Sequence, residues 1–470
     1  MSRHIRHTLL ALASGALIQR VALLISTLIV ARALDLAELG LLAIGLQAGR
    51  LLGLLADAGP RAIAAREAAH RPRAEALAWI AAARRASLPI ALALTAVWAL
   101  AVLALAPERP VFWLLCGALA VPTARDLKGL ADALGSTRVE VRLENLCTLA
   151  LLAGTLLAWR LELLGAEMLA ALNVGSRLLY ALLGELWLAR RGAPVERVSL
   201  RAAHGRLHLL SIAQVANQAI FSSDVILLGL LGRAEAAGLY HAAQRIAQAA
   251  ELPLGLLARA VQPHLAAAAS GGDARGALER IVRASAFLVL PVAAGGWVVA
   301  EPLLHRLFGA RFEAAAWTLR WLLLAAVAIH VGSRYGNLLF ARKEHRPYLR
   351  SIGLGAGLNL ALSLLWIPGY GASGTALATA IGACAAALCA AIELHRRLRF
   401  DVIAPYPRPL LLAVAVALAA LAVPTEIGVL VRVGAGAVVF AIGLYLLELR
   451  RGLRHVGSGL VRASGFDRAS

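Results

Sequence analysis

The sequence is divided into apolar runs, each long enough for a helix to cross a bilayer core, which takes about 20 residues. Hydrophobic residues make up 60% of the 470 residues, far more than in a soluble domain. In lipid the backbone must satisfy its hydrogen bonds internally, and a helix does this within one run. We therefore expect an all-α polytopic membrane protein with about 14 transmembrane helices. The runs fall at 9–31, 36–58, 86–106, 110–132, 141–160, 165–189, 206–231, 234–260, 281–304, 313–340, 349–368, 371–394, 408–424 and 427–448.

Basic residues are concentrated in alternate loops between these runs. The second loop contains Arg61, Arg66 and Arg73, whereas odd loops, such as the one with Glu108 and Arg109, are short and nearly balanced. Because cytoplasmic loops collect Lys and Arg, this alternation predicts an even number of spans and cytoplasmic N- and C-termini. It also accounts for the net charge of +20, so nucleic acid is not an expected partner.

Two stretches indicate that the chain is duplicated. The turns 34–41 (LDLAELGL) and 231–240 (LGRAEAAGLY) share Ala-Glu and Gly-Leu steps, and Arg50 or Arg245 follows inside the next run. Each half begins on the cytoplasmic side, so the repeat is parallel, and a transporter built this way has its substrate site between the halves. We expect a six-helix bundle over 1–200, a second over 201–400, two additional membrane helices over 401–450 and a basic cytoplasmic tail over 451–470.

The cysteines and the N-terminus exclude other classes of protein. The four cysteines form no CxxC pair and no cluster with histidine, so neither a disulfide framework nor a metal site is expected. The first apolar run is too long for a signal peptide and contains Gln19 and Arg20, so we interpret it as a retained membrane helix.

Three pieces of the sequence, spread over most of its length, resemble one family. The first piece contains Asp224, 231–240, Arg245, Pro253 and Pro263. The second contains Ala31–Leu34, Glu38–Gly40 and Asp57–Gly59. The third contains Asn359-Leu360 and 366–379 (WIPGYGASGTALAT). In this order and spacing they resemble the multidrug/oligosaccharidyl-lipid/polysaccharide (MOP) transporter superfamily, and within it the polysaccharide-transport branch of Wzx-type O-antigen or oligosaccharide flippases.

The resemblance implies two six-helix bundles that face each other around a central cavity. It implies alternating access that moves an undecaprenyl-pyrophosphate-linked oligosaccharide across the bacterial inner membrane for O-antigen, capsule or exopolysaccharide synthesis. The expected partners are this lipid-linked oligosaccharide, the membrane, and as candidates a polysaccharide polymerase and a chain-length regulator.

Arginines inside the spans are the candidate substrate-binding residues. Each ionisable group at that depth costs about 2.5–3.5 kcal/mol in an insertion experiment, so such groups face a cavity or pair with one another. A guanidinium binds phosphate oxygens in a bidentate manner, which suits a pyrophosphate head group. Arg125, Arg320 and Arg334 lie nearer span ends, where an arginine can also extend to the interface. The candidates are Arg20, Arg50, Arg177, Arg245 and Arg334.

Two acidic residues inside the spans are candidates for cation coupling. Asp224 precedes the second turn and either pairs with Arg245 or couples transport to a cation. Glu251 is a second coupling candidate, although it precedes Pro253 and a kink would also explain its position. His330 is expected to pack in the cavity wall rather than relay protons. No cofactor is expected beyond coupling to Na⁺ or protons.

Three other functions were compared with the flippase. A multidrug or cation antiporter of the same superfamily would favour acidic and aromatic lumen residues, but here arginine outnumbers carboxylate. A lipid II flippase stays open, because such proteins also have fourteen spans. A membrane-embedded polysaccharide polymerase needs a large outer loop or a carboxylate pair, and the odd loops are short and lack an Asp-x-Asp pair. An enzyme is therefore not expected, and no nucleotide-binding loop is present.

Overall fold

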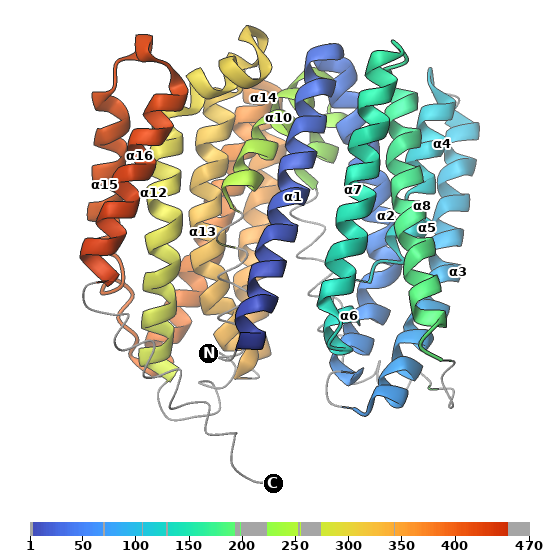
Figure 1. Ribbon diagram of the computed structural model, residues 1–470, viewed down its shortest axis with the longest axis horizontal. Helices are drawn as coiled ribbons and strands as arrows, with labels where there is room; N and C mark the ends of the chain where they lie inside the picture. Colours follow the sequence, from blue (N-terminus) through green and yellow to red (C-terminus); the bar gives the residue numbers. More distant parts are fainter. Residues whose placement is uncertain are drawn as a thin grey trace. The chain divides into compact units, whose positions relative to one another are not determined.

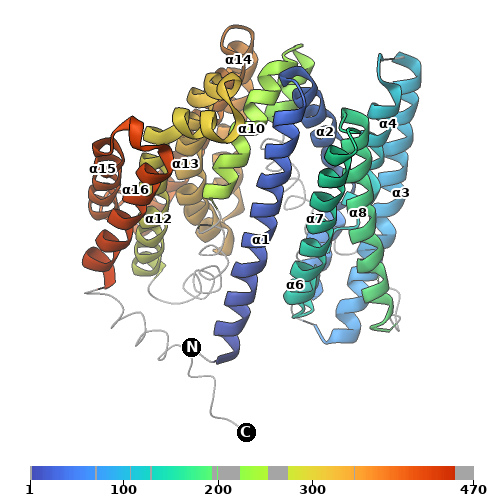
Figure 2. The same cartoon turned by 45° about the horizontal axis from the view of Figure 1, so that its top comes forward.

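The described part of the chain is built from α-helices (Figures 1 and 2). The computed structural model describes residues 3–68, 71–105, 107–127, 130–192, 198, 223–251, 254, 274–342 and 344–449. Nine helices in these ranges are long and apolar enough to cross a membrane. The prediction of an all-α polytopic membrane protein is confirmed. The helices are α1 (Arg3–Ala33), α2 (Leu36–Ala68), α3 (Arg73–Leu105), α4 (Pro110–Ala118), α5 (Ala120–Thr123), α6 (Leu130–Ala133), α7 (Thr137–Arg160), α8 (Ala166–Ala189), α10 (Ala234–Ala250), α12 (Ala274–Phe308), α13 (Ala316–Ala341), α14 (His345–Leu398), α15 (Pro407–Ala422) and α16 (Val429–Leu444).

Helices α2 and α3 extend well beyond the apolar runs from which they were predicted. The prediction began the third span at 86, whereas α3 begins at Arg73. The extra turns of α3 bury Trp79 and Ile80 against Ile63 and Ala64 of α2. An amphipathic extension of this kind has too many polar residues to count as an apolar run, although one face of it packs into a core.

The fourth predicted span, 110–132, is not one continuous helix. It is divided into α4, α5 and α6, and residues 124–127 are not helical. Pro122 lies in α5, where it has no N–H to donate to the preceding turn and its ring crowds that turn. A broken helix at membrane depth needs other donors for its free carbonyl groups. Arg84 of α3 supplies one, because its Nη2 donates to the carbonyl oxygen of Arg125 at 3.3 Å.

Helix α14 contains two spans that meet at a kink. Gly371 interrupts it with a φ of 51° and a ψ of −126°, a backbone conformation that glycine adopts without steric cost. The sequence predicted two runs, 349–368 and 371–394, separated by a turn at Gly371. The turn has the predicted position, but it bends the helix sharply instead of forming a separate loop.

The chain forms two compact units, which are described separately. Unit 1 contains residues Met1–Ala13, Ile246–Leu362 and Ala376–Ser470, and unit 2 contains Ser14–Arg245 and Ser363–Thr375. In unit 1, α15 and α16 pack against α12 (Figure 1), and Phe287, Leu412 and Val416 form the core of that contact. The repeat-based boundaries at 200 and 400 stay a prediction.

Candidate functional site

Four arginines from four helices of unit 2 form one cluster. They are Arg20 of α1, Arg50 of α2, Arg177 of α8 and Arg245 of α10. Arg50 lies within electrostatic range of both Arg177 and Arg245, and Arg20 within range of Arg245. These four side chains, which the sequence analysis had proposed for substrate binding, are called the arginine cluster below.

One carboxylate, Glu144 of α7, accompanies the arginine cluster. Arg177 donates to it through Nη1 at 3.1 Å and through Nη2 at 2.9 Å, a bidentate arrangement. Gln19 of α1 donates to the same carboxylate from its Nε2 at 2.9 Å. The sequence analysis did not single out Glu144. The criterion that selected the arginines, an ionisable residue inside an apolar run, would have found it.

Neutral groups hold the other arginines in place. Arg50 Nη2 donates to Asn173 Oδ1 at 3.4 Å, and Asn173 is anchored because its Nδ2 donates to the carbonyl oxygen of Leu169 at 2.9 Å. Arg245 Nε lies 3.4 Å from His241 Nε2. For this contact to be a hydrogen bond, Nε2 must accept, so His241 is neutral with its proton on Nδ1. Neutral partners position these guanidinium groups without cancelling their charge.

The arginine cluster therefore has a surplus of positive charge that remains accessible. Among the described residues of the cluster, the four arginines and Glu144 give a formal charge of +3, since 4 − 1 = 3. All four arginine side chains are half-buried, and 34% of the Arg177 side chain is exposed. Guanidinium groups in a low-dielectric environment are suited to bind phosphate or carboxylate groups.

The acidic candidate of unit 2 is buried beside a tyrosine. Asp224, which is 2% exposed, accepts a hydrogen bond from the hydroxyl of Tyr240 at 2.5 Å. Tyr240 belongs to the second of the two similar turns of the sequence, 231–240, and is itself buried. The proposed pairing of Asp224 with Arg245 and its role in cation coupling both stay predictions.

The remaining two predicted site residues lie in unit 1, close to one histidine. His330 Nε2 of α13 is 3.6 Å from Glu251 Oε2. Arg334, one helical turn after His330, is 3% exposed, and its Nε has no hydrogen-bond partner among the described residues. Pro253 and Pro263 lie outside the described residues. The structure thus groups Glu251 with His330 in unit 1, whereas the four arginines of the cluster are in unit 2.

A second group of charges in unit 2 is balanced. Arg84 Nη2 and Arg125 Nη1 lie 2.6 and 3.1 Å from Glu185 Oε1. Arg84 also donates to the backbone of Arg125, and Arg125 Nη1 donates to the carbonyl oxygen of Arg84 at 3.2 Å. Arg125 had been expected either to extend to the interface or to line the cavity. The structure gives it an ion pair with Glu185 of α8, a carboxylate that it shares with Arg84 of α3.

The same balanced group continues into α2. Arg61 Nε lies 3.2 Å from Asp57, and Arg61 Nη1 lies 3.6 Å from Asp126. Tyr180 of α8 donates from its hydroxyl to Asp126 Oδ1 at 3.2 Å. Three positive and three negative residues cancel here. We call this group the paired network: Asp57, Arg61, Arg84, Arg125, Asp126 and Glu185.

The duplicated turns of the sequence pack against each other within unit 2. A Cβ atom placed on Gly40 would lie 1.7 Å from the carbonyl oxygen of Ala234, and one on Gly238 would lie 2.4 Å from that of Leu36. Only glycine permits so close an approach of two backbones. Asp35, just before α2, caps this helix because its Oδ1 accepts from the Glu38 N–H at 2.7 Å.

The kink of α14 joins the same contact. Arg233 Nη2 donates to the carbonyl oxygen of Pro368 at 2.6 Å, and a Cβ on Gly371 would lie 3.3 Å from Ala236. The three sequence pieces that carry the family resemblance therefore meet at one place. Two of them come from duplicated positions, and the third contributes the turn at 368–371.

Metal ligands are not gathered in the described ranges. Within them, no group of three or more His, Cys, Asp or Glu side chains could hold a metal ion.

Two protein families match this chain, and their matches overlap. Residues 6–268 match the profile of the family described as polysaccharide biosynthesis protein. Residues 212–446 match that of the lipid II flippase MurJ. Each match covers half of the chain or more. The chain belongs to the MOP superfamily of transporters. The matched families are transporters and flippases rather than enzymes, as the sequence predicted.

Solved structures of MOP transporters have the same fold. A structure described as lipid II flippase MurJ in an inward closed conformation matches with a TM-score of 0.72 at 14% identity, covering 93% of this chain and 98% of that one. An inward-facing MATE family multidrug transporter matches with a TM-score of 0.63 at 15% identity, over 82% and 96% of the two chains. Identities this low establish the fold alone.

A third structure, a MOP superfamily transporter from Pyrococcus furiosus, matches with a TM-score of 0.56 at 16% identity and covers 83% of this chain and 95% of that chain. Among curated protein sequences, none matches this chain. The MurJ structure covers a larger share of this chain than either of the other two.

Proposed function

We propose that this MOP transporter flips an undecaprenyl-pyrophosphate-linked oligosaccharide across the bacterial inner membrane for the synthesis of a surface polysaccharide. The observation that carries the proposal is the surplus positive charge of the arginine cluster, +3 over four helices of unit 2. A pyrophosphate is the part of such a lipid that every member of the substrate class shares. A site that binds it can tolerate variation in the sugars.

The chemistry of the arginine cluster argues against a cationic substrate. Its carboxylate, Glu144, accepts three hydrogen bonds, two from Arg177 and one from Gln19. A carboxylate engaged in this way is a poor partner for a cationic drug. The guanidinium groups of the cluster suit phosphate oxygens instead.

In the proposed cycle, the arginine cluster binds the pyrophosphate while the polyprenyl tail stays in the bilayer. Release of the pyrophosphate then requires either that an anionic group of the protein takes its place beside the arginines or that the lipid-bound conformation becomes less stable. A coupling cation supplies the free energy for this step. Asp224 and Glu251 are the proposed coupling carboxylates, with Na⁺ or a proton as the cation. We propose cytoplasmic N- and C-termini, which reporter fusions to each terminus would test.

A lipid II flippase is the second candidate, because residues 212–446 match the lipid II flippase MurJ. Its substrate has the same polyprenyl pyrophosphate, so the arginine cluster suits both. The sugar part of the substrate distinguishes the two functions.

Mass spectrometry of lipid extracts from a strain depleted of this protein tests the proposal. We expect accumulation of an undecaprenyl-pyrophosphate oligosaccharide, with the sugars of the surface polysaccharide, that disappears when the wild-type gene is restored. Accumulation of lipid II would assign the second candidate. Unchanged polyprenyl lipids, together with altered resistance to cationic drugs, would overturn both and indicate a multidrug transporter.

A further inference from the structure

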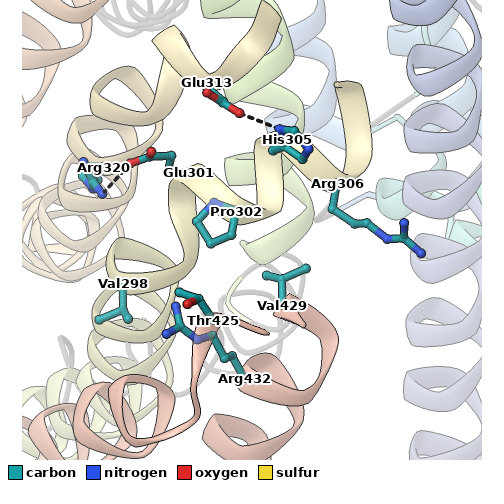
Figure 3. Close-up of a pocket in the computed structure, with 10 residues that line it drawn as sticks. All are labelled: Val298, Glu301, Pro302, His305, Arg306, Glu313, Arg320, Thr425, Val429 and Arg432. Atoms are coloured by element: carbon teal, nitrogen blue, oxygen red, sulfur yellow. Dashed lines mark hydrogen bonds and ion pairs between the residues drawn. The ribbon is translucent and has the colours of Figure 1, made fainter. Parts of the chain in front are cut away.

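A cavity of about 500 Å³ lies at one end of unit 1, between α12, the start of α13 and the α15–α16 pair (Figure 3). Its volume is within the range of small-molecule sites, about 300–1,000 Å³. One wall is formed by Thr425 of the connection between α15 and α16 and by Val429 and Arg432 of α16, and α12 forms the opposite wall through residues such as Pro302. The additional helix pair, which the sequence repeat leaves out, thus completes this cavity.

The cations of this cavity have more free donors than its anions have free acceptors. Of the two carboxylates, Glu313 is bound to His305 Nδ1 at 2.5 Å, and Glu301 faces Arg320 at 4.0 Å (Figure 3). Arg306 has no hydrogen-bond or ion-pair partner among the described residues, and in Figure 3 its side chain extends from the rim of the cavity, away from Arg432.

Arg432 is held with its charged end free. Its Nε donates to the carbonyl oxygen of Val423 at 2.8 Å, which fixes the side chain, while its two Nη groups have no partner in the described ranges. In Figure 3 its guanidinium lies beside Thr425, whose hydroxyl can also donate. This preorganised group of donors is suited to a phosphate.

The surroundings of the cavity indicate the depth of a membrane interface. Arg320 reaches from the cavity to the ring of Trp317, with its Cζ 4.8 Å from the ring centroid, and Trp317 stacks on Trp321. Trp297 packs edge-on against both rings. Tryptophan is enriched at the boundary between lipid and water. The loop charges predict that this end is extracytoplasmic.

Apolar side chains extend outward next to the charged cavity. Ile427 and Leu430, on either side of the α15–α16 turn, are 57% and 68% exposed. A soluble anion would gain nothing from them, whereas the acyl or prenyl chain of a lipid would pack on them. The combination therefore favours a ligand with an anionic head and an apolar tail.

We propose that this cavity binds the phosphate group of an anionic lipid at the extracytoplasmic interface, with Arg432 as the principal phosphate ligand, Arg306 as a second cation at the rim and the α15–α16 turn as the contact for the tail. The lipid is a phospholipid such as phosphatidylglycerol, or a polyprenyl pyrophosphate in the outer leaflet. This site is separate from the arginine cluster, so it does not depend on the function proposed above.

Native mass spectrometry of the purified, delipidated full chain tests the proposal by titration. The probes are phosphatidylglycerol, undecaprenyl pyrophosphate, and diacylglycerol as a lipid with the same tails as phosphatidylglycerol but no phosphate. The double variant Arg306→Gln/Arg432→Gln should weaken the first binding event of a phosphate lipid by about tenfold or more, as expected from the loss of charge-assisted hydrogen bonds. Glu301→Gln, which removes a negative charge, should strengthen it.

Arg408→Gln is the matched control, because Arg408 is an exposed arginine on α15 that does not line this cavity. It should leave the affinity unchanged. If the double variant misfolds, Arg306→Gln alone serves, since Arg306 has no hydrogen-bond or ion-pair partner among the described residues. Preferential binding of either phosphate lipid supports the proposal and identifies its source. Equal affinity in wild type and variant, equal binding of diacylglycerol, or displacement by inorganic phosphate at the concentration of the lipid would overturn it.

Discussion

The arginine cluster and the paired network of unit 2 both contain several arginines, yet they differ in charge balance. The paired network has three arginines and three carboxylates, and its side chains bind one another and the broken backbone of α4–α6. The arginine cluster has four arginines and one carboxylate, and neutral Asn173 and His241 hold two of its guanidinium groups. Among the described residues, the formal charges of the paired network cancel, whereas those of the arginine cluster leave a surplus of +3.

This difference shows how an ionisable residue in a membrane helix can be assigned to structure or to function. An arginine with a carboxylate partner does not need a ligand to balance its charge. The attraction within the pair offsets much of the free-energy cost of burying the guanidinium group. An arginine held by neutral groups keeps its charge for a ligand. The assignment therefore depends on the partner of the arginine rather than on the arginine itself. The arginine cluster and the paired network are close neighbours, because Tyr180 contacts both. Its hydroxyl bonds to Asp126 of the paired network, and its ring lies 5.9 Å from the Arg177 guanidinium.

The largest effect is expected for Arg245→Ala, with Arg20→Ala as its companion. Loss of one guanidinium from the arginine cluster should weaken binding of the pyrophosphate lipid by about a hundredfold, which corresponds to about 3 kcal/mol. Export should be abolished while the protein still inserts. The melting temperature should not fall, because Arg245 repels Arg20 and Arg50. Complementation of the depleted strain measures export.

Arg125→Ala is the control for this pair of variants. It removes an arginine of the paired network, so export should fall only as far as the amount of folded protein falls. Normal surface polysaccharide from Arg245→Ala at native expression would contradict the proposed role of the arginine cluster.

Glu185→Gln should give the opposite phenotype, a loss of stability without a specific loss of function. The substitution leaves buried Arg84 and half-buried Arg125 without their shared carboxylate. Loss of the charged partner should lower the free energy of unfolding by about 1–3 kcal/mol. Thermal unfolding in detergent measures this change, and export per folded molecule should stay near wild type. Unchanged stability would show that the network is not needed for the fold.

Glu144→Gln should remove the carboxylate that pairs with Arg177 in the arginine cluster. Arg177 loses its charged partner, and the formal charge of the cluster rises from +3 to +4. Pyrophosphate binding should tighten by about tenfold, while turnover slows because release becomes harder. Binding of undecaprenyl pyrophosphate to the purified protein, compared with export in cells, separates the two effects. Weaker binding would mean that Glu144 positions Arg177 more than it neutralises it.

The smallest effect is expected for Arg50→Lys, which keeps the charge but loses the guanidinium fork. Binding should weaken by about threefold, as for the loss of one ordinary hydrogen bond. The ratio of the Arg50→Lys and Arg50→Ala effects separates the contribution of charge from that of geometry. Equal effects of the two substitutions would show that the fork matters more than the charge.

Much of the fold could be predicted because apolar runs and turn sequences are local features. The spans of α7, α8, α15 and α16 agree with the predicted runs within a few residues. The helical start of α3 at Arg73 could not be read from hydropathy, because its amphipathic turns are stabilised by packing on α2. The sequence shows the cause of the helix break, which is Pro122. The donor that satisfies a free carbonyl group at the break is Arg84, which is distant in sequence and could not be predicted.

The candidate site could be predicted only in part. Depth in an apolar run selected Arg20, Arg50, Arg177 and Arg245, and the structure brings these four together. The same criterion did not reveal that Arg125 is paired, because its partner Glu185 lies on another helix. Pairing is a property of tertiary structure, and a single sequence carries no record of which helices are neighbours.

The contact between the backbones at Gly40 and Gly238 limits which residues the two similar turns can contain. Along most of a membrane helix one side chain can replace another of similar size and polarity. A glycine pressed against a carbonyl oxygen has no such substitute. The turns 34–41 and 231–240 therefore constrain each other, because a larger residue at the glycine of either turn would push the other backbone away. A substitution in one turn would have to be tolerated by both.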